Sequence, residues 1–305
     1  MSKIVISKVF TLTGHRDCIY TLKEAGTNNK FFSGAGDGMV VSWDLKEPEQ
    51  GELIARVPAS VYALDYCPFK DLLVLGQNYE GIQLINISSK KLIGSLKLTS
   101  AAIFDIKILD DKIYVGTGAG ELIIVNIENL SIKKRIKAAE KSLRCIEVDP
   151  LNKRLVAGFS DNIIRIFNLE DYSIIQVIEA HKNSVFTLCF SPDYHYLLSA
   201  GRDAHLRIWN ARNEFEHQES IVAHMYAINH VDYSPDGKYF VTCSMDKSIK
   251  VWDAQTFKLL KVIDKARHAG HGTSVNKLLW SKHENYLISC SDDRTISVWD
   301  IAFGL

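Results

Sequence analysis

One four-residue pattern recurs four times in this chain, and its fixed spacing limits the folds that the chain can adopt. In each copy a histidine precedes a tryptophan by 28 positions, a serine or threonine precedes it by ten, and an aspartate by six. A catalytic site has no reason to occur four times at one spacing, so we interpret the pattern as a structural network. The four copies are His15, Ser33, Asp37 and Trp43; His181, Ser199, Asp203 and Trp209; His224, Thr242, Asp246 and Trp252; and His271, Ser289, Asp293 and Trp299.

Three weaker copies fill the gap between the first and second complete ones. The seven units are separated by 42, 40, 42, 42, 43 and 47 residues, close to the period of about 40–45 residues that four-stranded propeller blades show. They account for nearly the whole chain and predict one domain, residues 1–305, without a linker. The units end near Asp44, Asn86, Asn126, Asn168, Asn210, Asp253 and Asp300.

Each unit contains short runs of β-forming residues separated by turns. In the fifth unit the runs are "SVFTLCF", "YLLSA", "LRIWN" and "ESIVA". The last unit has only three such runs, while the chain starts with a run, "KIVISKVFTL", that has no unit before it. Pairing these two ends would close a ring and protect the sheet edges. The sequence therefore predicts an all-β, seven-bladed β-propeller of four-stranded antiparallel blades, closed by the N-terminal strand.

The repeated pattern resembles that of the WD-repeat (WD40) family. The shared features are a histidine after a small residue, the serine or threonine, the turn aspartate and the closing Trp-Asp, and the resemblance covers essentially all 305 residues. It implies the same propeller, with the four pattern residues forming a buried hydrogen-bond network in each complete blade. We expect apolar packing to replace the network in units 2 and 4, a replacement that can be energetically neutral. The residues at the four positions are Val57, Leu75, Tyr79 and Ile85 in unit 2, and Ala139, Ala157, Asp161 and Phe167 in unit 4, where Asp161 alone is retained and is expected to serve its turn.

The family resemblance also implies that partners bind where the first strand of each blade begins, around the mouth of a central channel. Four of the seven residues at one register of these strands are aromatic, in a chain with 10% aromatic residues. Aromatic and arginine side chains dominate the energetics of many interfaces. We therefore predict a partner-binding ring of Tyr20, Tyr62, Phe104, Arg144, Phe186, Asn229 and Asn276, with Arg202, Met245 and Asp292 on its rim.

The predicted function is a non-enzymatic scaffold that binds a protein or peptide, as a monomeric propeller within a hetero-complex. An Arg or Lys stacked between the aromatic rings is one candidate anchor. Asp292 would neutralise that cation, whereas Arg144 and Arg202 would favour an acidic neighbour on the same peptide. The alternative interpretation is that the rings only plug the channel.

Two other functions remain open at the channel mouth: small-molecule binding or catalysis, and RNA binding by base stacking. Catalysis lacks a pair of acids there, because Asp292 is the only candidate. Equal numbers of basic and acidic residues, 36 each, weaken the case for nucleic acid. No cofactor is expected. The histidine pair His268 and His271 is expected to lie in a partner-contacting loop rather than to bind metal, because His271 belongs to the fourth pattern.

No apolar run is long enough to cross a membrane, and Lys8 interrupts the apolar N-terminal segment. These features predict a cytoplasmic location, or a nuclear one in a cell with a nucleus.

Overall fold

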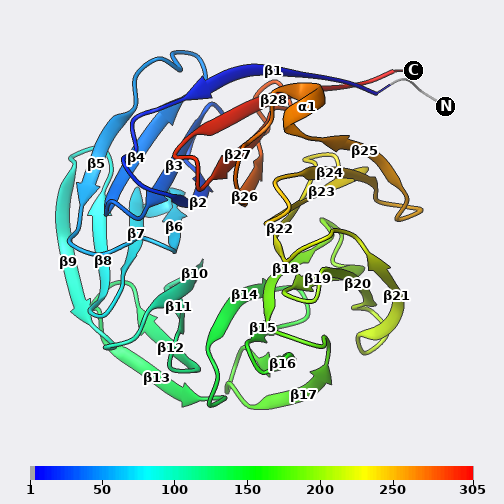
Figure 1. The fold of residues 1–305 in the computed structure, drawn as a ribbon. Coiled ribbons are helices and arrows are strands. Elements are labelled where there is room, and N and C mark those ends of the chain that lie inside the picture. The colour runs from blue at the N-terminus through cyan, green and yellow to red at the C-terminus, as the bar shows by residue number, and fades with distance from the viewer. Residues whose placement is uncertain (1–3, 305) are drawn as a thin grey trace.

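The computed structural model describes residues 4–304 and arranges them as seven four-stranded antiparallel sheets around a central axis (Figure 1). This is the seven-bladed β-propeller that the repeat predicts. The blades follow one another around the ring in chain order. The first strand of each blade lies innermost and contacts the first strands of its neighbours.

Six blades are built from four consecutive strands. Blade 1 holds β2 (Ile19–Glu24), β3 (Lys30–Ala35), β4 (Met39–Asp44) and β5 (Glu52–Arg56), and blade 2 holds β6 (Leu64–Cys67), β7 (Leu72–Gln77), β8 (Gly81–Asn86) and β9 (Lys91–Lys97). Blade 3 holds β10 (Ile103–Leu109), β11 (Lys112–Thr117), β12 (Glu121–Asn126) and β13 (Ile132–Lys137). Blade 4 holds β14 (Leu143–Asp149), β15 (Arg154–Phe159), β16 (Ile163–Asn168) and β17 (Ile174–Glu179).

The remaining blades complete the ring. Blade 5 holds β18 (Val185–Phe190), β19 (Tyr196–Gly201), β20 (His205–Asn210) and β21 (Glu216–Val222), and blade 6 holds β22 (Ile228–Tyr233), β23 (Tyr239–Ser244), β24 (Ile249–Asp253) and β25 (Leu259–Ile263). Blade 7 holds β26 (Val275–Trp280), β27 (Leu287–Ser291), β28 (Ile296–Phe303) and, from the other end of the chain, β1 (Ile4–Leu12). The predicted closure is therefore confirmed: β1 pairs antiparallel with β28, from Ile4 opposite Phe303 to Leu12 opposite Ile296.

The Asp or Asn at the end of each third strand forms the turn that follows it. In blade 4, for example, the Asn168 side-chain oxygen accepts a hydrogen bond from the Glu170 backbone N–H at 2.7 Å. Asp44 and Asp253 make the same contact with the N–H groups two residues later. Such side-chain caps favour turns. Asp300 is the exception, because β28 continues past it to Phe303 alongside β1.

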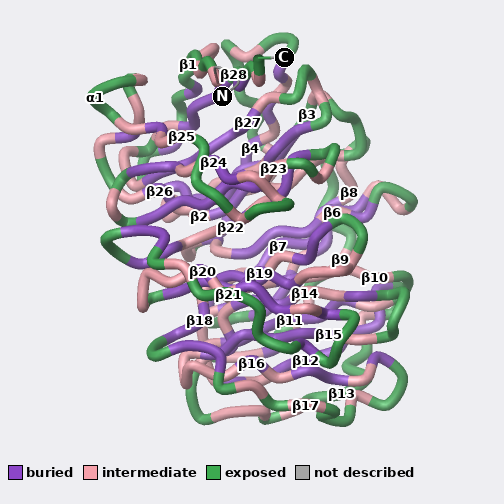
Figure 2. Tube along the Cα trace, turned by 90° about the vertical axis from the view of Figure 1, so that its right-hand side faces the viewer, coloured by how far each residue is buried: buried purple, intermediate pink, exposed green. Residues whose placement is uncertain are grey.

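The apolar core lies between the blades. Each hydrophobic cluster joins residues of two neighbouring blades, such as Phe32 and Val40 of blade 1 with Leu73 and Ile85 of blade 2. Figure 2 shows the buried stretches running along the strands, while exposed stretches lie in the connections and along outer strands such as β13 and β21. Two one-turn helices were not expected from the sequence: a 3-10 turn at Pro68–Lys70 and α1 at Lys265–His268, which Asp264 caps. Within the described residues, no helix is long and apolar enough to cross a membrane.

The two faces of the ring are defined by the connections. The top face holds the starts of the first strands and the turns from second to third strands, as the hydrogen bond from Gly36 N–H to the Cys18 carbonyl shows. The bottom face holds the turns from first to second strands and from third to fourth strands.

Candidate functional site

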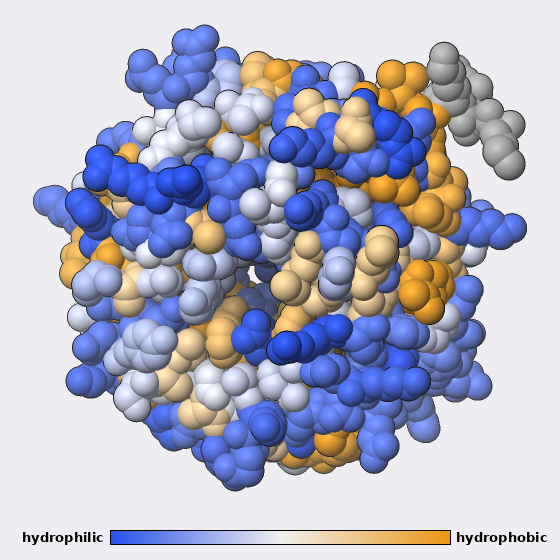
Figure 3. All heavy atoms as spheres, viewed as in Figure 1, coloured by the Kyte–Doolittle hydropathy of each residue, from blue (hydrophilic) through white to orange (hydrophobic). Residues whose placement is uncertain are grey.

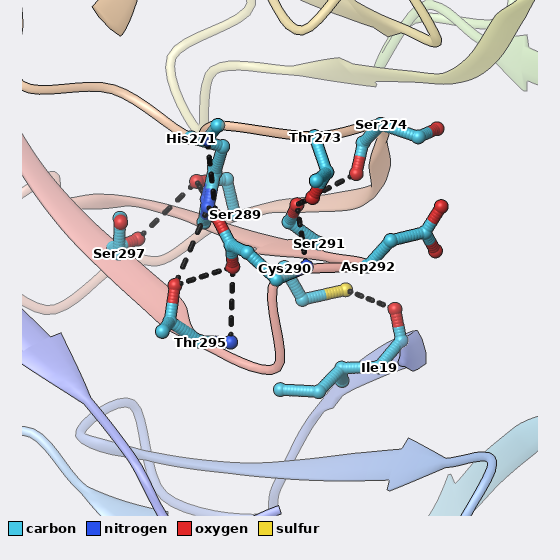
Figure 4. A network of polar contacts seen from close by, with 12 residues as sticks. Ile19, His271, Thr273, Ser274, Ser289, Cys290, Ser291, Asp292, Thr295 and Ser297 are labelled. Atoms are coloured by element: carbon cyan, nitrogen blue, oxygen red, sulfur yellow. Dashed lines mark hydrogen bonds and ion pairs between the residues drawn. The ribbon is translucent and has the colours of Figure 1, made fainter. Parts of the chain in front are cut away.

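The four-residue pattern forms one hydrogen-bonded chain in each of blades 1, 5, 6 and 7, and Figure 4 shows this region of blade 7. The closest distances from the histidine Nδ1 to the aspartate oxygens are 3.2, 3.0, 2.9 and 2.9 Å in chain order. The histidine Nε2 lies 2.7–2.9 Å from the serine or threonine oxygen. The tryptophan Nε1–H donates to that same oxygen over 2.8–2.9 Å.

These contacts assign the protons. A carboxylate only accepts, so the histidine Nδ1–H donates to it, and the histidine Nε2 accepts from the hydroxyl. Burial lowers the pKa of His15, His181 and His224, which keeps these rings neutral. Burial opposes the ionisation of Asp203, but hydrogen bonds from His181 and from backbone N–H groups outweigh it and hold the pKa of Asp203 below its usual range. The network therefore stabilises the blade and leaves no reactive group free.

Apolar residues replace the network in blades 2 and 4, as expected. Val57, Leu75 and Ile85 are buried together in one cluster between blades 1 and 2. Tyr79 departs from the expectation: it is exposed and lies in a turn with a positive φ of 68°. In blade 4, Asp161 acts in its turn, where it accepts from the Ile163 N–H and pairs with Arg165 at 2.8 Å.

Six of the seven predicted ring residues occupy β-bulges. The register of the first strand shifts around Tyr20, Phe104, Arg144, Phe186, Asn229 and Asn276, so each of these residues lacks a paired partner on the second strand. The seventh, Tyr62, lies just before β6. A bulge redirects a side chain away from the regular alternation and is over-represented beside active sites.

All seven ring residues line one cavity of about 350 Å³ in the central channel. Figure 3 shows the hollow at the centre of the ring. The structure thus places the predicted residues together, and this aromatic, arginine and amide wall is called the channel mouth below.

The channel mouth is a continuous arc of planar groups. The Tyr20 and Tyr62 ring centroids lie 4.7 Å apart edge to face, and Tyr62 stacks on Phe104 at 5.8 Å. The Arg144 guanidinium carbon then lies 3.8 Å from the Phe104 centroid and 5.0 Å from that of Phe186. The protein's own Arg144 therefore lies between two of the aromatic rings, and an Arg or Lys anchor on a partner stays a prediction.

The two asparagines of the channel mouth bridge neighbouring blades. Asn229 Nδ2 donates to the Val275 carbonyl of blade 7 at 2.8 Å, and Asn276 Nδ2 donates to the Ile19 carbonyl of blade 1 at 2.9 Å. Asn276 also donates to Asp292 Oδ1 at 2.7 Å. Asp292 Oδ1 thus helps to position Asn276.

The rim carries exposed side chains on the top face. Arg202 is exposed in the turn between β19 and β20, and Met245 in the turn between β23 and β24. Sequence reasoning missed Met225 and Tyr226, which are exposed in the connection from β21 to β22. The Met245 N–H donates to the Ala227 carbonyl, which joins the two segments. A Met-Tyr pair directly after the pattern histidine His224 is the signal that could have identified them.

Ionisable residues deeper in the channel were also missed. Asp105, Lys107, Glu147, His230 and Lys277 line the same cavity below the channel mouth. They lie one or three positions after the ring residues of their strands, which is the signal that could have located them. Lys107 pairs with Glu147 at 2.7 Å. Asp105 Oδ2 accepts from the Ile146 backbone N–H of the next blade at 2.7 Å.

The histidine pair between blades 6 and 7 does not converge on one point. His268 ends α1, while His271 is buried in the blade 7 network. In the part of the chain that the structure describes, no group of three or more His, Cys, Asp or Glu side chains is placed to hold a metal ion.

Comparison with known proteins agrees with this architecture. The sequence model described as "WD domain, G-beta repeat" matches residues 6–44, 172–210, 215–253 and 262–300, together just over half of the chain. Each match ends one residue after the tryptophan of a complete network. In three dimensions the chain is similar to the WD40 β-propeller domain of Doa1, with a TM-score of 0.84 and 16% identity over 98% of this chain and 97% of that one.

Relatives with curated names match over part of their length. The WD repeat-containing protein 91 homolog of Dictyostelium discoideum is 24% identical over 207 residues, and Striatin-3 of Homo sapiens is 25% identical over 232; each match covers 65% of this chain and 27% of the relative. The THO complex subunit 6 homolog of Danio rerio is 27% identical over 175 residues, covering 50% of this chain and 54% of that protein. The chain thus spans only about a quarter to a half of these relatives. Its networks, closure and repeat matches place it in the WD40 repeat family.

Proposed function

We propose that this protein is a non-catalytic scaffold subunit of a larger complex, and that a segment of a partner protein enters the channel mouth on the top face. One observation carries the proposal: seven residues, one from each blade, converge on a single cavity. Six of them are bulge residues, a local distortion that the fold does not need for pairing. A complex subunit among the relatives is consistent with this role.

The surface around the cavity has the composition of an interface. Aromatic, methionine and arginine side chains are enriched at interface cores, and the rim on the top face presents Met225, Tyr226 and Met245 as exposed side chains. The cavity volume of about 350 Å³ suits one or two side chains of an extended segment. A cytoplasmic or nuclear location remains a prediction.

The competing functions find less support. The two carboxylates of the cavity are already engaged, Asp105 with a backbone N–H group and Glu147 with Lys107, so an acid–base pair is not free. Base stacking needs open ring faces. Phe104 already contacts both Tyr62 and Arg144.

The test is an affinity capture from the source organism's lysate with three baits: the wild type, Tyr62→Ala/Phe186→Ala at the channel mouth, and Phe69→Ala/Leu151→Ala on the bottom face. Phe69 and Leu151 are exposed in turns between first and second strands. We expect a partner, identified by mass spectrometry, that the first and third baits retain and the second loses.

Thermal denaturation controls for folding. Each channel-mouth substitution removes aromatic contacts worth about 1 kcal/mol, so only a small decrease in melting temperature is expected for the double variant. A large decrease in its melting temperature would show that these rings belong to the hydrophobic core. Equal capture by all three baits would move the binding site away from the channel mouth.

A further inference from the structure

Arg144 is the only ring residue with a full charge, and its environment is unusual. Its guanidinium carbon lies over the Phe104 ring at 3.8 Å and over the Phe186 ring at 5.0 Å, so aromatic rings flank the group. The N–H donors of a guanidinium lie in its plane, where stacking leaves them free. Among residues 4–304, no acidic side chain pairs with Arg144 and no protein atom accepts a hydrogen bond from it. The aromatic rings therefore orient the guanidinium, while its N–H groups still lack an acceptor.

Three basic and two acidic side chains line the cavity, and Lys107 pairs with Glu147 among them. Lys107, Arg144 and Lys277 are cationic, and Asp105 and Glu147 are anionic. Burial, together with the nearby lysines, lowers the pKa of His230 well below its usual range, so that ring adds no charge. Arg144 is thus a cation of this wall with which none of the lining acids forms an ion pair.

We propose that the free edge of Arg144 binds one carboxylate of an extended peptide segment of the partner, an Asp or Glu side chain or a chain end. This inference rests on the proposed function and names its anchor. Arginine and carboxylate form two parallel N–H···O bonds in one plane, and the two phenylalanines hold Arg144 in a fixed orientation for that contact. The apolar rim residues Met225, Tyr226 and Met245 then contact residues that flank the acid.

The same geometry disfavours other anchors. A lysine or arginine would meet the positive charges of Arg144 and Lys277 in the same cavity. A phosphate group carries nearly two negative charges and would bring the second close to Asp105 and Glu147. A monovalent carboxylate avoids both conflicts.

The test uses libraries of heptapeptides bound to the purified protein. In four sets the ends are acetylated and amidated, and the central residue is Asp or Glu, Asn or Gln, Lys or Arg, or phosphoserine. A fifth set has neutral side chains and a free C-terminal carboxylate. We expect enrichment in the first or the fifth set, and these two arms distinguish a side-chain carboxylate from a chain end.

Dissociation constants of enriched peptides are then measured for four proteins. Arg144→Gln should weaken binding at least tenfold, Arg144→Lys should weaken it less, and Arg212→Gln, an exposed arginine on the bottom face, should match the wild type. The peptide is also varied by changing its acid to the amide. This change should weaken binding to the wild type as much as Arg144→Gln weakens binding of the acidic peptide. It should not weaken binding to the Arg144→Gln protein any further.

The outcomes distinguish failure of the carboxylate anchor from failure of peptide binding itself. Enrichment of neutral, basic or phosphorylated peptides, or equal binding by wild type and Arg144→Gln, would overturn the carboxylate anchor and leave peptide binding standing. Failure of every set, with wild-type protein folded, would count against peptide binding itself. The peptide-side substitution tests the anchor even if an Arg144 variant fails to fold.

Discussion

At the residue scale, the hydroxyl of each network both accepts and donates. Ser199 is fully buried, and its oxygen accepts from Trp209 Nε1–H while its proton goes to His181 Nε2. One small side chain thus satisfies two large buried polar groups. A buried donor or acceptor without a partner costs about 1–3 kcal/mol. The stability of a blade therefore depends more on this serine than its size suggests.

Ser199→Ala is expected to lower the free energy of unfolding by about 3 kcal/mol, measured by urea denaturation followed by circular dichroism. The triple variant His181→Ala/Ser199→Ala/Trp209→Phe gives blade 5 the residues that blade 4 has at these positions. Because no orphaned polar group then remains, its loss should be smaller than the sum of the three single losses. A loss below 1 kcal/mol for Ser199→Ala would contradict the role assigned to the network.

At the element scale, β1 decides whether the ring is closed. Its side chains alternate, with Ile4 and Ile6 packing on the blade 6–7 core and Val5 exposed. Without β1, the whole length of β28 would be an unpaired edge. The unpaired N–H and C=O groups of an exposed strand edge can pair with a strand of another chain.

A variant lacking residues 1–12 should therefore melt at a lower temperature and self-associate, as measured by light scattering after size exclusion. A synthetic peptide of residues 3–12 added in trans should restore the monomer, because it supplies the missing strand. The same peptide with Ile6→Asp serves as the control and should not restore it. A stable monomer without β1 would show that closure contributes little.

At the scale of the whole molecule, aspartate side chains hydrogen-bond the inner strands of neighbouring blades to one another. Asp65 Oδ2 accepts from the Ile108 N–H of blade 3 at 2.6 Å, and Asp232 Oδ2 accepts from the Trp280 N–H of blade 7 at 2.7 Å. Burial raises the pKa of Asp232 to about 7, against the hydrogen bonds from Trp280 and Tyr233. Lys277 lowers this pKa and Glu147 raises it, but burial dominates.

The raised pKa of Asp232 predicts a pH dependence. An unfolded Asp has a pKa of about 3.9, so between that value and pH 7 the folded protein binds a proton that the unfolded chain does not. This contribution to stability is full below the unfolded pKa and is lost as the pH rises to 7, by up to about 1.4 kcal/mol per pH unit.

In Asp232→Asn this dependence is gone, so the stability advantage of the wild type over the variant should shrink from pH 4 to pH 8, as measured by urea denaturation. Asp300→Asn, which changes an exposed carboxylate, is the control and should show no such trend. An advantage that grows with pH would mean that Asp232 is ionised in the folded protein.

Much of the architecture could be predicted because it is repeated. The histidine-to-tryptophan spacing of 28 residues identified the blades, and the closing Asp or Asn identified the turns that Asn168 and its equivalents form. A repeated local contact leaves a repeated pattern, so four complete copies sufficed to place three degenerate ones. The exposed Tyr79 and the short α1 helix break the pattern once each, and for that reason were not anticipated.

The sequence by itself determined the fold class, the number of blades, the closure by β1 and the seven side chains that face the channel mouth. Only the tertiary structure decided how those side chains meet. Arg144 lies between Phe104 and Phe186, which come from the two neighbouring blades about 40 residues away in either direction. A contact of this kind depends on bulges and on the spacing of blades around the ring, neither of which is encoded within one repeat. The chemistry of the channel is therefore a property of the closed ring.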